Sequence, residues 1–450
     1  MPDAFESYRI FEGADKTQKA ELPEEKPAIA PVEEGLAVNT LIQENYPDVK
    51  IKSVKNILLS RMHEPDKAWR THSICAVKAD AYLVVVETDQ GHIGYGEVCS
   101  YGGPPVIASW VDWFARIMVG RSLSEAWRVA RPRGLNWAHD GAVAGLDCAF
   151  WDILGQITGK TVAVLLGADP KVTEVDAYAS GGVSYDWGVN PDQLIDEVVG
   201  YKNMGYTTSK IRMGTAWQFD GVTPERFIKH MKKLRDAVGP DFRLALDGNA
   251  RLNLDEALVV AKGLNDLGFV WFEDAIPIWD IDGFKALQKV APDVTISGGE
   301  VMQSLDQYRP YFEQGALQML HPDAGWMGIT EMKAVMEMAA TYGISCDPHG
   351  WHNGALAIMH AHIMAGAPLY GQVEVNFSQG PLRDGILADG TPTAKGKLSV
   401  PQVPGFGIKL APDLEKKFPY LDFGYHAEIM HPYKEIKPTA RNYMENNPFR

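Results

Sequence analysis

Between Lys210 and Glu374 the sequence repeats one pattern: a short apolar stretch, a residue able to do chemistry, a polar loop and an amphipathic helical stretch. The apolar stretches and their closing residues are, in order, SKIR (209–212), LALDGN (244–249), VWFED (270–274), ISGGE (296–300), HPDAG (321–325), CDPHG (346–350) and QVEVNF (372–377). The intervening stretches, such as TPERFIKHMKKLRDAVG (223–239), carry apolar residues at helical spacing. This alternation is typical of a parallel β-barrel whose site lies at the carboxyl ends of its strands.

Five acidic or basic residues follow these apolar stretches at nearly constant intervals. Asp247, Glu273, Glu300, Asp323 and His349 are separated by 26, 27, 23 and 26 residues. One strand, one helix and their loops take about that many residues, so each of the five would recur at an equivalent point of the next strand. We therefore expect their side chains to converge at one mouth of the barrel.

Three of these residues, Asp247, Glu273 and Glu300, are carboxylates at the ends of consecutive predicted strands. Three carboxylates that converge on one point repel each other unless a hard cation lies between them. Ligation by oxygen alone, with water or substrate in the remaining positions, favours Mg²⁺. A single carboxylate at a strand end is more often a helix cap or an ion-pair partner, but three at regular spacing favour a magnesium site.

Asp323 and His349 end the next two predicted strands, so their side chains can meet. A carboxylate bonded to one imidazole nitrogen fixes the tautomer and raises the basicity, which leaves the other nitrogen to exchange protons with a substrate. An isolated histidine would more often be structural. His352, three residues further on, is expected in the loop and is the weaker candidate.

Two cations are expected on the opposite side of this site. Lys210 and Arg212 alternate along one predicted strand and therefore face the same way, into the barrel mouth. They could bind a substrate carboxylate or stabilise an enolate, and Glu374 could hydrogen-bond the same carboxylate if it is protonated. Asn249, two residues after Asp247, is a further candidate for contact with the substrate.

The remaining sequence divides into recognisable segments. Residues 1–50 are acidic and indicate a loosely ordered N-terminal extension. Residues 51–172 begin with alternating apolar stretches and are expected to form a smaller α+β domain. The barrel is expected over residues 173–385, with its first strand in VDAYASGG (175–182). Residues 386–450 are expected to return to the smaller domain and to end in a tail.

The smaller domain contains two polar loops of the kind that cover a site. One is RMHEPDKAWRTHS (61–73), and the other begins near Tyr101. Arg61, His63, His72 and Tyr101 are candidates for gripping the hydroxyls or a carboxylate of a substrate. Solvated loop residues are the alternative interpretation for each of them.

Composition and charge exclude several classes of partner. With 46% hydrophobic and 22% charged residues, the chain of 450 residues has the composition of an ordinary globular protein. Its net charge of −15 argues against nucleic acid or an anionic membrane as a partner. The four cysteines are dispersed, no apolar run reaches the roughly 18 residues of a membrane span, and the N-terminus does not resemble a signal peptide. We therefore expect a cytoplasmic protein.

Taken together, these motifs resemble the mandelate racemase subgroup of the enolase superfamily. The resemblance covers roughly residues 51–412, and includes GYGE (94–97) and LDCAFWDILGQITGK (146–160). It implies a modified TIM barrel, (β/α)₇β, under an α+β capping domain built from N- and C-terminal segments. It also implies Mg²⁺ bound by Asp247, Glu273 and Glu300, and a proton-transfer dyad of Asp323 and His349. Lys210 and Glu374 would contact the substrate carboxylate, and the shared step is removal of the proton α to that carboxylate.

Arg212 departs from the racemase pattern, which has lysine at this position as a second base. Arginine holds its proton too strongly to act as a general base at neutral pH. This favours a one-base reaction through His349, namely dehydration of an aldonate or aldarate to a 2-keto-3-deoxy acid. The enzyme alternative is a racemase or epimerase of a 2-hydroxy acid, and the non-enzyme alternative is an inactive barrel that serves as a binding protein. We expect a small carboxylate as substrate and a homo-oligomer as the assembly.

Overall fold

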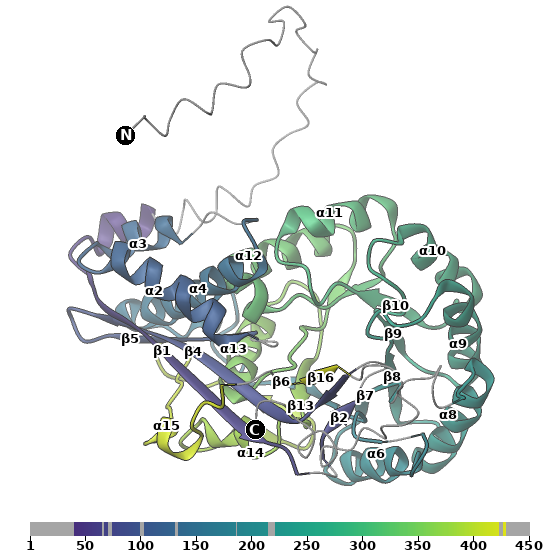
Figure 1. Ribbon diagram of the computed structural model, residues 1–450. Helices are drawn as coiled ribbons and strands as arrows, with labels where there is room; N and C mark the ends of the chain where they lie inside the picture. Colours follow the sequence, from purple (N-terminus) through teal and green to yellow (C-terminus); the bar gives the residue numbers. More distant parts are fainter. Residues whose placement is uncertain are drawn as a thin grey trace, which may run out of the picture.

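The computed structural model describes residues 40–64, 67–70, 74–99, 103–130, 134–185, 187–214, 221–422 and 426–428. A barrel forms the larger part, and a cap of sheet and helices packs against one side of it (Figure 1). Most of the expected N-terminal extension lies outside the described residues. Residues 40–45 are already helical and Ile42 is buried, which is earlier than the expected start near Ile51. Within the described part of the chain, no helix is long and apolar enough to cross a membrane.

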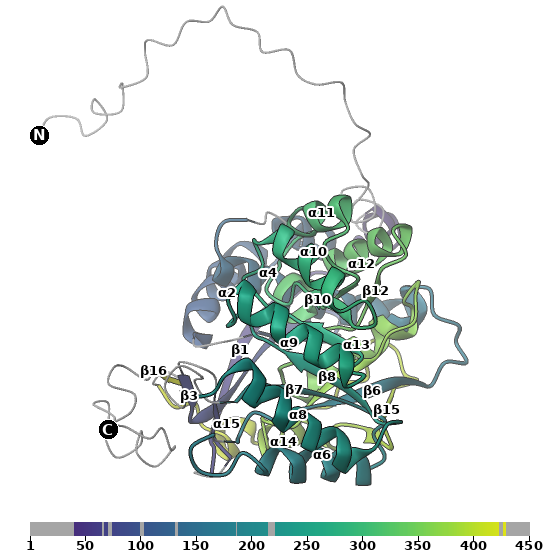
Figure 2. The same cartoon turned by 90° about the vertical axis from the view of Figure 1, so that its right-hand side faces the viewer.

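The barrel consists of parallel strands joined by helices, which confirms the predicted fold class (Figures 1 and 2). Its strands are β6 (Glu174–Ser180), β7 (Thr208–Arg212), β8 (Arg243–Asp247), β9 (Trp271–Glu273), β10 (Thr295–Gly298), β11 (Met319–Leu320), β12 (Ser345–Cys346) and β13 (Val373–Asn376). The helices between them are α6 (Gln193–Asn203), α8 (Pro224–Val238), α9 (Leu254–Asp266), α10 (Ile281–Val290), α11 (Leu305–Gln314), α12 (Ala324–Thr341) and α13 (Gly354–Ala365). Neighbouring strands pair in parallel from β6 to β12, and β13 pairs in parallel with β6.

Helix α8 shows how the local sequence produces these elements. The Thr223 hydroxyl accepts a hydrogen bond from the Arg226 N–H at its start, and Pro224 occupies the first helical turn. Gly239, with φ of 81°, follows its last residue. Polar caps, an early proline and a final glycine are the usual helix boundaries. The apolar face of α8 is buried against the barrel, so each helix fixes the strand end beside it.

The cap contains an antiparallel sheet of β1 (Ile51–Met62), β4 (Lys78–Thr88) and β5 (Ile93–Val98), with helices on one face. These helices are α2 (Pro104–Met118), α3 (Leu123–Val129), α4 (Trp137–Thr158) and α5 (Val162–Leu165). The two glycines of the GYGE motif allow β5 to lie directly on α4. A Cβ atom at Gly94 or Gly96 would lie 2.0 Å from the carbonyl oxygen of Ala149 or Gly145. This close approach fixes the position of the next residue, Glu97.

The C-terminal segment contacts the barrel before it reaches the cap. After α14 (Pro381–Gly385), the strands β14 (Thr393–Ala394) and β15 (Lys397–Ser399) form a hairpin, and β15 pairs antiparallel with β6. The chain then passes through α15 (Leu414–Lys417), and the Ser60 N–H donates to the Phe418 carbonyl at 3.3 Å. A small sheet joins β16 (His426–Glu428), β3 (Ile74–Ala76) and β2 (Trp69–Arg70). The expected domain limits stay a prediction.

Candidate active site

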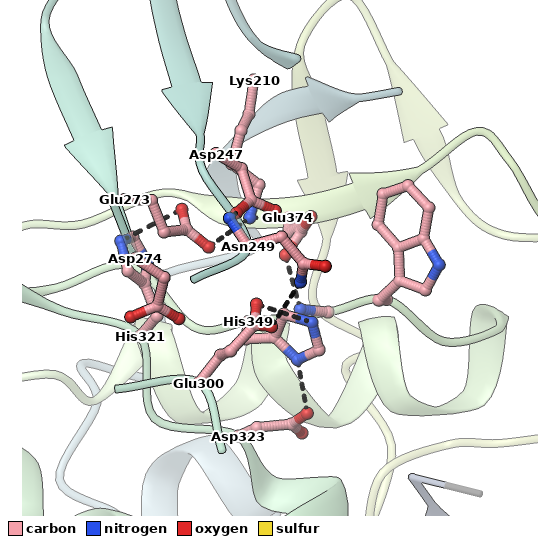
Figure 3. A network of polar contacts seen from close by, with 12 residues as sticks. Lys210, Asp247, Asn249, Glu273, Asp274, Glu300, His321, Asp323, His349 and Glu374 are labelled. Atoms are coloured by element: carbon pink, nitrogen blue, oxygen red, sulfur yellow. Dashed lines mark hydrogen bonds and ion pairs between the residues drawn. The ribbon is translucent and has the colours of Figure 1, made fainter. Parts of the chain in front are cut away.

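Three carboxylates meet at the carboxyl ends of neighbouring barrel strands. Asp247 ends β8 and is the cross-strand partner of Glu273 at the end of β9, and Glu300 lies two residues beyond β10. One oxygen from each lies within 4.8 Å of the other two, and all three residues are buried (Figure 3). Parallel strands in register bring equivalent residues of consecutive βα units together, as the sequence spacing predicts.

The three carboxylates fit a divalent cation. Asp247 Oδ2 and Glu300 Oε2 are buried and accept no hydrogen bond within the described part of the chain. Burial raises the pKa of Glu273 well above its usual value, and the charges of Asp247 and Glu300 add to this effect while Lys210 opposes it. A hard cation between the three carboxylates would bind these oxygens as ligands and offset their mutual repulsion.

Lys210 is tied into the same group of carboxylates. Its Nζ lies 2.6 Å from Glu273 Oε1 and 3.2 Å from Glu374 Oε1. Burial alone would lower the pKa of Lys210, but these carboxylates outweigh it and raise the pKa. Burial alone would raise the pKa of Glu374, but Lys210 and His349 hold it at about 2. The lowered pKa favours the ionised form of Glu374, which accepts a hydrogen bond from the Gly350 N–H at 2.7 Å. A hydrogen bond from Glu374 to a substrate carboxylate would require the protonated form and stays a prediction.

Arg212 is held in a fixed position between a carboxylate and an aromatic ring. Its Nε lies 2.8 Å from Asp247 Oδ2 without the alignment of a hydrogen bond, so the contact is ionic. Its guanidinium carbon lies 4.4 Å from the centre of the Trp351 ring. Both contacts favour the charged guanidinium, which is consistent with a positioning and charge-stabilising role and not with that of a base.

Asp323 and His349 form a buried hydrogen-bonded pair beside the carboxylate cluster. His349 Nδ1 lies 2.8 Å from Asp323 Oδ2, and His349 Nε2 lies 3.4 Å from Glu300 Oε2 (Figure 3). Burial alone would lower the pKa of His349, but Glu300 and Asp323 raise it to about 9. Asp323 also accepts the Gly325 N–H at 2.7 Å, as the N-cap of α12. Its position just after strand β11 and its N-cap hydrogen bond to α12 together fix the Asp323 carboxylate that orients the imidazole.

His352 is more closely involved than the sequence predicted. It was expected in the loop as a weaker candidate, but its Nε2 lies 2.6 Å from Asp323 Oδ2, the same oxygen that His349 contacts. The rings of His349 and His352 are 5.5 Å apart and nearly perpendicular. A third imidazole, that of His360, accepts the Ala324 N–H at 3.1 Å. The signal for His352 was its position three residues after His349 in the same loop.

Two residues around the cluster were missed by sequence reasoning. His321 contacts Ser297 Oγ at 2.9 Å and lies 3.2 Å from Glu273 Oε2. Burial lowers its pKa to about 3, so it is a neutral support for Glu273. Asp274 accepts the Gly299 N–H at 3.1 Å, and burial raises its pKa well above the usual value. The position of His321 two residues before Asp323 could have indicated that it faces the same side.

The predicted substrate contacts lie in two different places. Asn249, in a left-handed conformation with φ of 47°, donates its backbone N–H to Asp247 Oδ1 at 2.7 Å and its side-chain amide lies 3.4 Å from Glu300 Oε1. Arg61 and His63 line a cavity of about 680 Å³ between the cap and the loops after β6 and β13. His72 and Tyr101 lie outside the described residues.

Arg61 and His63 carry polar atoms that point to a ligand. Arg61 contacts Glu64, yet its Nη1 is buried without a hydrogen-bond partner in the described part of the chain. The same holds for His63 Nε2. Burial, with Arg61 adding to it, lowers the pKa of His63 to about 4, so this imidazole is neutral. A neutral imidazole and one free guanidinium edge suit hydroxyl groups.

Known proteins resemble both parts of the chain. Residues 193–414 match the enolase C-terminal domain-like family, and residues 61–167 match the N-terminal domain of the mandelate racemase / muconate lactonizing enzyme family. D-galactarolactone cycloisomerase of Agrobacterium fabrum is 26% identical over 391 residues, which are 82% of this chain and 99% of the relative. Arabinonate dehydratase of Saccharolobus solfataricus is 28% identical over 334 residues, 72% of this chain and 87% of the relative. The crystal structure of 3,6-anhydro-D-galactonate cycloisomerase from Zobellia galactanivorans has a TM-score of 0.71 at 27% identity, and covers 83% of this chain and 99% of that one.

Proposed function

This chain belongs to the mandelate racemase / muconate lactonizing enzyme family of the enolase superfamily, and within that family we propose that it is a magnesium-dependent dehydratase of a sugar acid. Enzymes of the family typically depend on a divalent metal. The observation that carries the proposal is the position of one imidazole: His349 Nε2 lies 3.4 Å from Glu300 Oε2, beside the three carboxylates.

Asp247, Glu273 and Glu300 would hold the cation. When bound, a divalent cation stabilises the negative charge that develops on a substrate carboxylate as its α-proton leaves. Lys210 lies against Glu273 and Glu374 and adds a fixed positive charge on the same side of the site. Arg212 adds a second one, held by Asp247 and Trp351. Preorganised charges of this kind act without reorganisation during the reaction.

His349 serves as the base. Asp323 holds its Nδ1, so Nε2 is the nitrogen that takes the α-proton. A cation held by the carboxylates would offset the charge of Glu300, the largest of the effects that raise the pKa of His349, and so favour the neutral imidazole that a base requires. The protonated imidazole then gives a proton to the departing β-hydroxyl, which leaves as water when both groups lie on the same face. The C–H and C–O bonds break and a C=C bond forms, and tautomerisation of this enol gives the 2-keto-3-deoxy acid. One base therefore suffices, in keeping with arginine at position 212.

The hydroxylated chain of the substrate would be bound by the cap. The cavity lined by Arg61 and His63 has further polar lining residues, which include Lys67, Ser184 and Ser378 together with the carboxylates of Glu64, Asp196 and Glu197. Asn249 would contact the end of the substrate nearer the carboxylates. This distribution suits an aldonate or aldarate better than a hydrophobic acid, and the assignment of these contacts is part of the proposal.

A cycloisomerase is the second candidate, because two of the relatives described above bear that name. The same base could remove the α-proton while a ring oxygen at the β-carbon leaves in place of a hydroxyl. A racemase or epimerase is less well supported, because it needs a second base and Arg212 is held as a cation by Asp247.

One screen separates these reactions. The purified enzyme with Mg²⁺ is incubated with a library of aldonates, aldarates and their lactones or anhydro forms, and the products are analysed by mass spectrometry and with a carbonyl reagent. Dehydration gives a keto acid lighter by one water. Cycloisomerisation leaves the mass unchanged while the ring opens or closes, and epimerisation changes neither the mass nor the carbonyl content. A product of unchanged mass would contradict the dehydratase proposal.

The expected homo-oligomer also stays a proposal.

A further inference from the structure

A carboxylate of the cap holds the start of α13, the helix that follows the loop of His349. Glu97, in β5, is 1% exposed. Its Oε1 accepts hydrogen bonds from the backbone N–H of Asn353 at 2.8 Å and from the Asn353 side-chain amide at 3.1 Å. Its Oε2 accepts the Leu356 N–H at 2.8 Å. The Asn353 side chain, at the N-cap position, does not cap the helix itself, so a carboxylate from the other domain satisfies these N–H groups.

Residues 349–353, here called the histidine loop, are anchored at every position to the barrel or to the cap. The anchors are, in order, His349 on Asp323, Gly350 on Glu374, the Trp351 ring under Arg212, His352 on Asp323, and Asn353 on Glu97. These five contacts involve four partner residues, and three of them, Asp323, Glu374 and Arg212, belong to the barrel site. Glu97 alone among them comes from the cap, and it holds the residue directly after His352.

We propose that Glu97 is a positioning residue for the reaction. By fixing Asn353 and the first turn of α13, it sets the place of His352 on Asp323 Oδ2, and thereby the orientation of the carboxylate that holds His349. The inference rests on the assignment of His349 as the base. It gives the cap a second role beside substrate contact, because the catalytic pair is complete only when β5 lies against the histidine loop.

Electrostatics supports this arrangement. Burial raises the pKa of Glu97, whereas the charge of His352 and the N–H donors of Leu356 and Asn353 lower it. A glutamine at position 97 keeps the shape but places an amide N–H₂ against one of the N–H groups, which turns one attraction into a repulsion.

The test compares Glu97→Gln with a matched control in the same domain. Asp152 is also buried (2% exposed) and accepts backbone N–H groups, from Phe406 at 2.9 Å and Tyr95 at 3.1 Å, but it does not contact the histidine loop in the described structure. Asn353→Ala is a milder second variant, which removes one donor to Glu97 and keeps the carboxylate. For each protein we would measure kcat and KM on the sugar acid found in the screen, and backbone amide exchange of residues 349–356 by mass spectrometry.

We expect Glu97→Gln to lower kcat by about tenfold to a hundredfold, with KM little changed, because small misplacements of a catalytic group have effects of this size. Asn353→Ala should lower kcat less, and exchange of residues 349–356 should accelerate in both variants. Asp152→Asn should lose stability but retain kcat per folded molecule. A wild-type kcat in folded Glu97→Gln would overturn the proposal. The proposal would also be overturned if activity fell in all three variants only in proportion to the fraction of folded protein. If the wild type turns over no sugar acid, the proposed function fails; unchanged exchange in Glu97→Gln and Asn353→Ala would then overturn the positioning role independently.

Discussion

His349 Nδ1 lies 2.8 Å from Asp323 Oδ2, although the two residues are 26 positions apart in the chain. The contact occupies one imidazole nitrogen and turns the other towards Glu300. Because Asp323 is itself held by the Gly325 N–H and by His352, the orientation of the imidazole is set before any substrate arrives. The structure thus places one candidate base next to the carboxylates, and the predictions below follow from that placement.

Removal of the metal should abolish activity. Chelation by EDTA should eliminate turnover and Mg²⁺ should restore it, because Lys210 and Arg212, the cations in contact with this cluster in the described structure, carry less charge than the three carboxylates together. Asp247→Asn, Glu273→Gln and Glu300→Gln should each weaken Mg²⁺ binding, measured by calorimetry, and reduce kcat severely. Asp266→Asn, at an exposed carboxylate on α9, is the control and should behave like the wild type. Full activity after thorough chelation would refute the metal site.

Lys210 should stabilise the protein most when metal is absent. Its Nζ contacts Glu273 and Glu374 in a fully buried cluster. Loss of one partner from a buried ion pair costs about 3–5 kcal/mol, so Lys210→Met should destabilise the metal-free protein by that order. Mg²⁺ should recover part of the loss. Denaturant unfolding with and without Mg²⁺ measures both effects, and a metal-free variant as stable as the wild type would contradict the expected role.

The cavity residues should control substrate preference. Arg61→Ala and His63→Ala remove Arg61 Nη1 and His63 Nε2, two buried polar atoms that have no hydrogen-bond partner in the described part of the chain. We expect KM to rise for long-chain sugar acids while kcat changes little, because these residues would bind the distal chain and do not touch the reacting carbon. Lys262→Ala, at an exposed side chain on α9 that does not line this cavity, is the control. Unchanged kinetics across several substrate chain lengths would contradict substrate binding by Arg61 and His63 and would favour a purely structural role for them in the capping domain.

The buried neutral histidines should make stability depend on pH. Burial lowers the pKa of His362 to about 4, whereas its usual value is 6.5. The unfolded chain therefore binds more protons between these values, so the stabilising contribution is complete above pH 6.5 and is lost as the pH falls to 4. His362→Gln should remove this contribution, which is about 3 kcal/mol for the full shift. Unfolding of both proteins at pH 7 and pH 4.5 measures the difference, and parallel pH profiles would contradict it.

The barrel and its central residues could be predicted from the sequence because both depend on regular spacing. Asp247, Glu273 and Glu300 recur with the βα period, and strand register converts that period into proximity. The lowered pKa of Glu374 could not be predicted in this way, since it depends on the 3.2 Å contact with Lys210. The contacts of Glu97 could not be predicted for another reason: its partners, Asn353 and Leu356, are more than 250 positions away in the other domain.

The central claim is that His349 is the base, and α-proton exchange tests it most directly. The true substrate is incubated in D₂O with wild type, His349→Asn and Asp323→Asn, and loss of the α-proton signal is followed by NMR. We expect no exchange and no dehydration in His349→Asn, and a large but incomplete loss in Asp323→Asn, where the imidazole remains with the wrong tautomer. If His349→Asn exchanges the α-proton at the wild-type rate, the base lies on the side of Lys210 and Arg212, and the proposed mechanism is wrong.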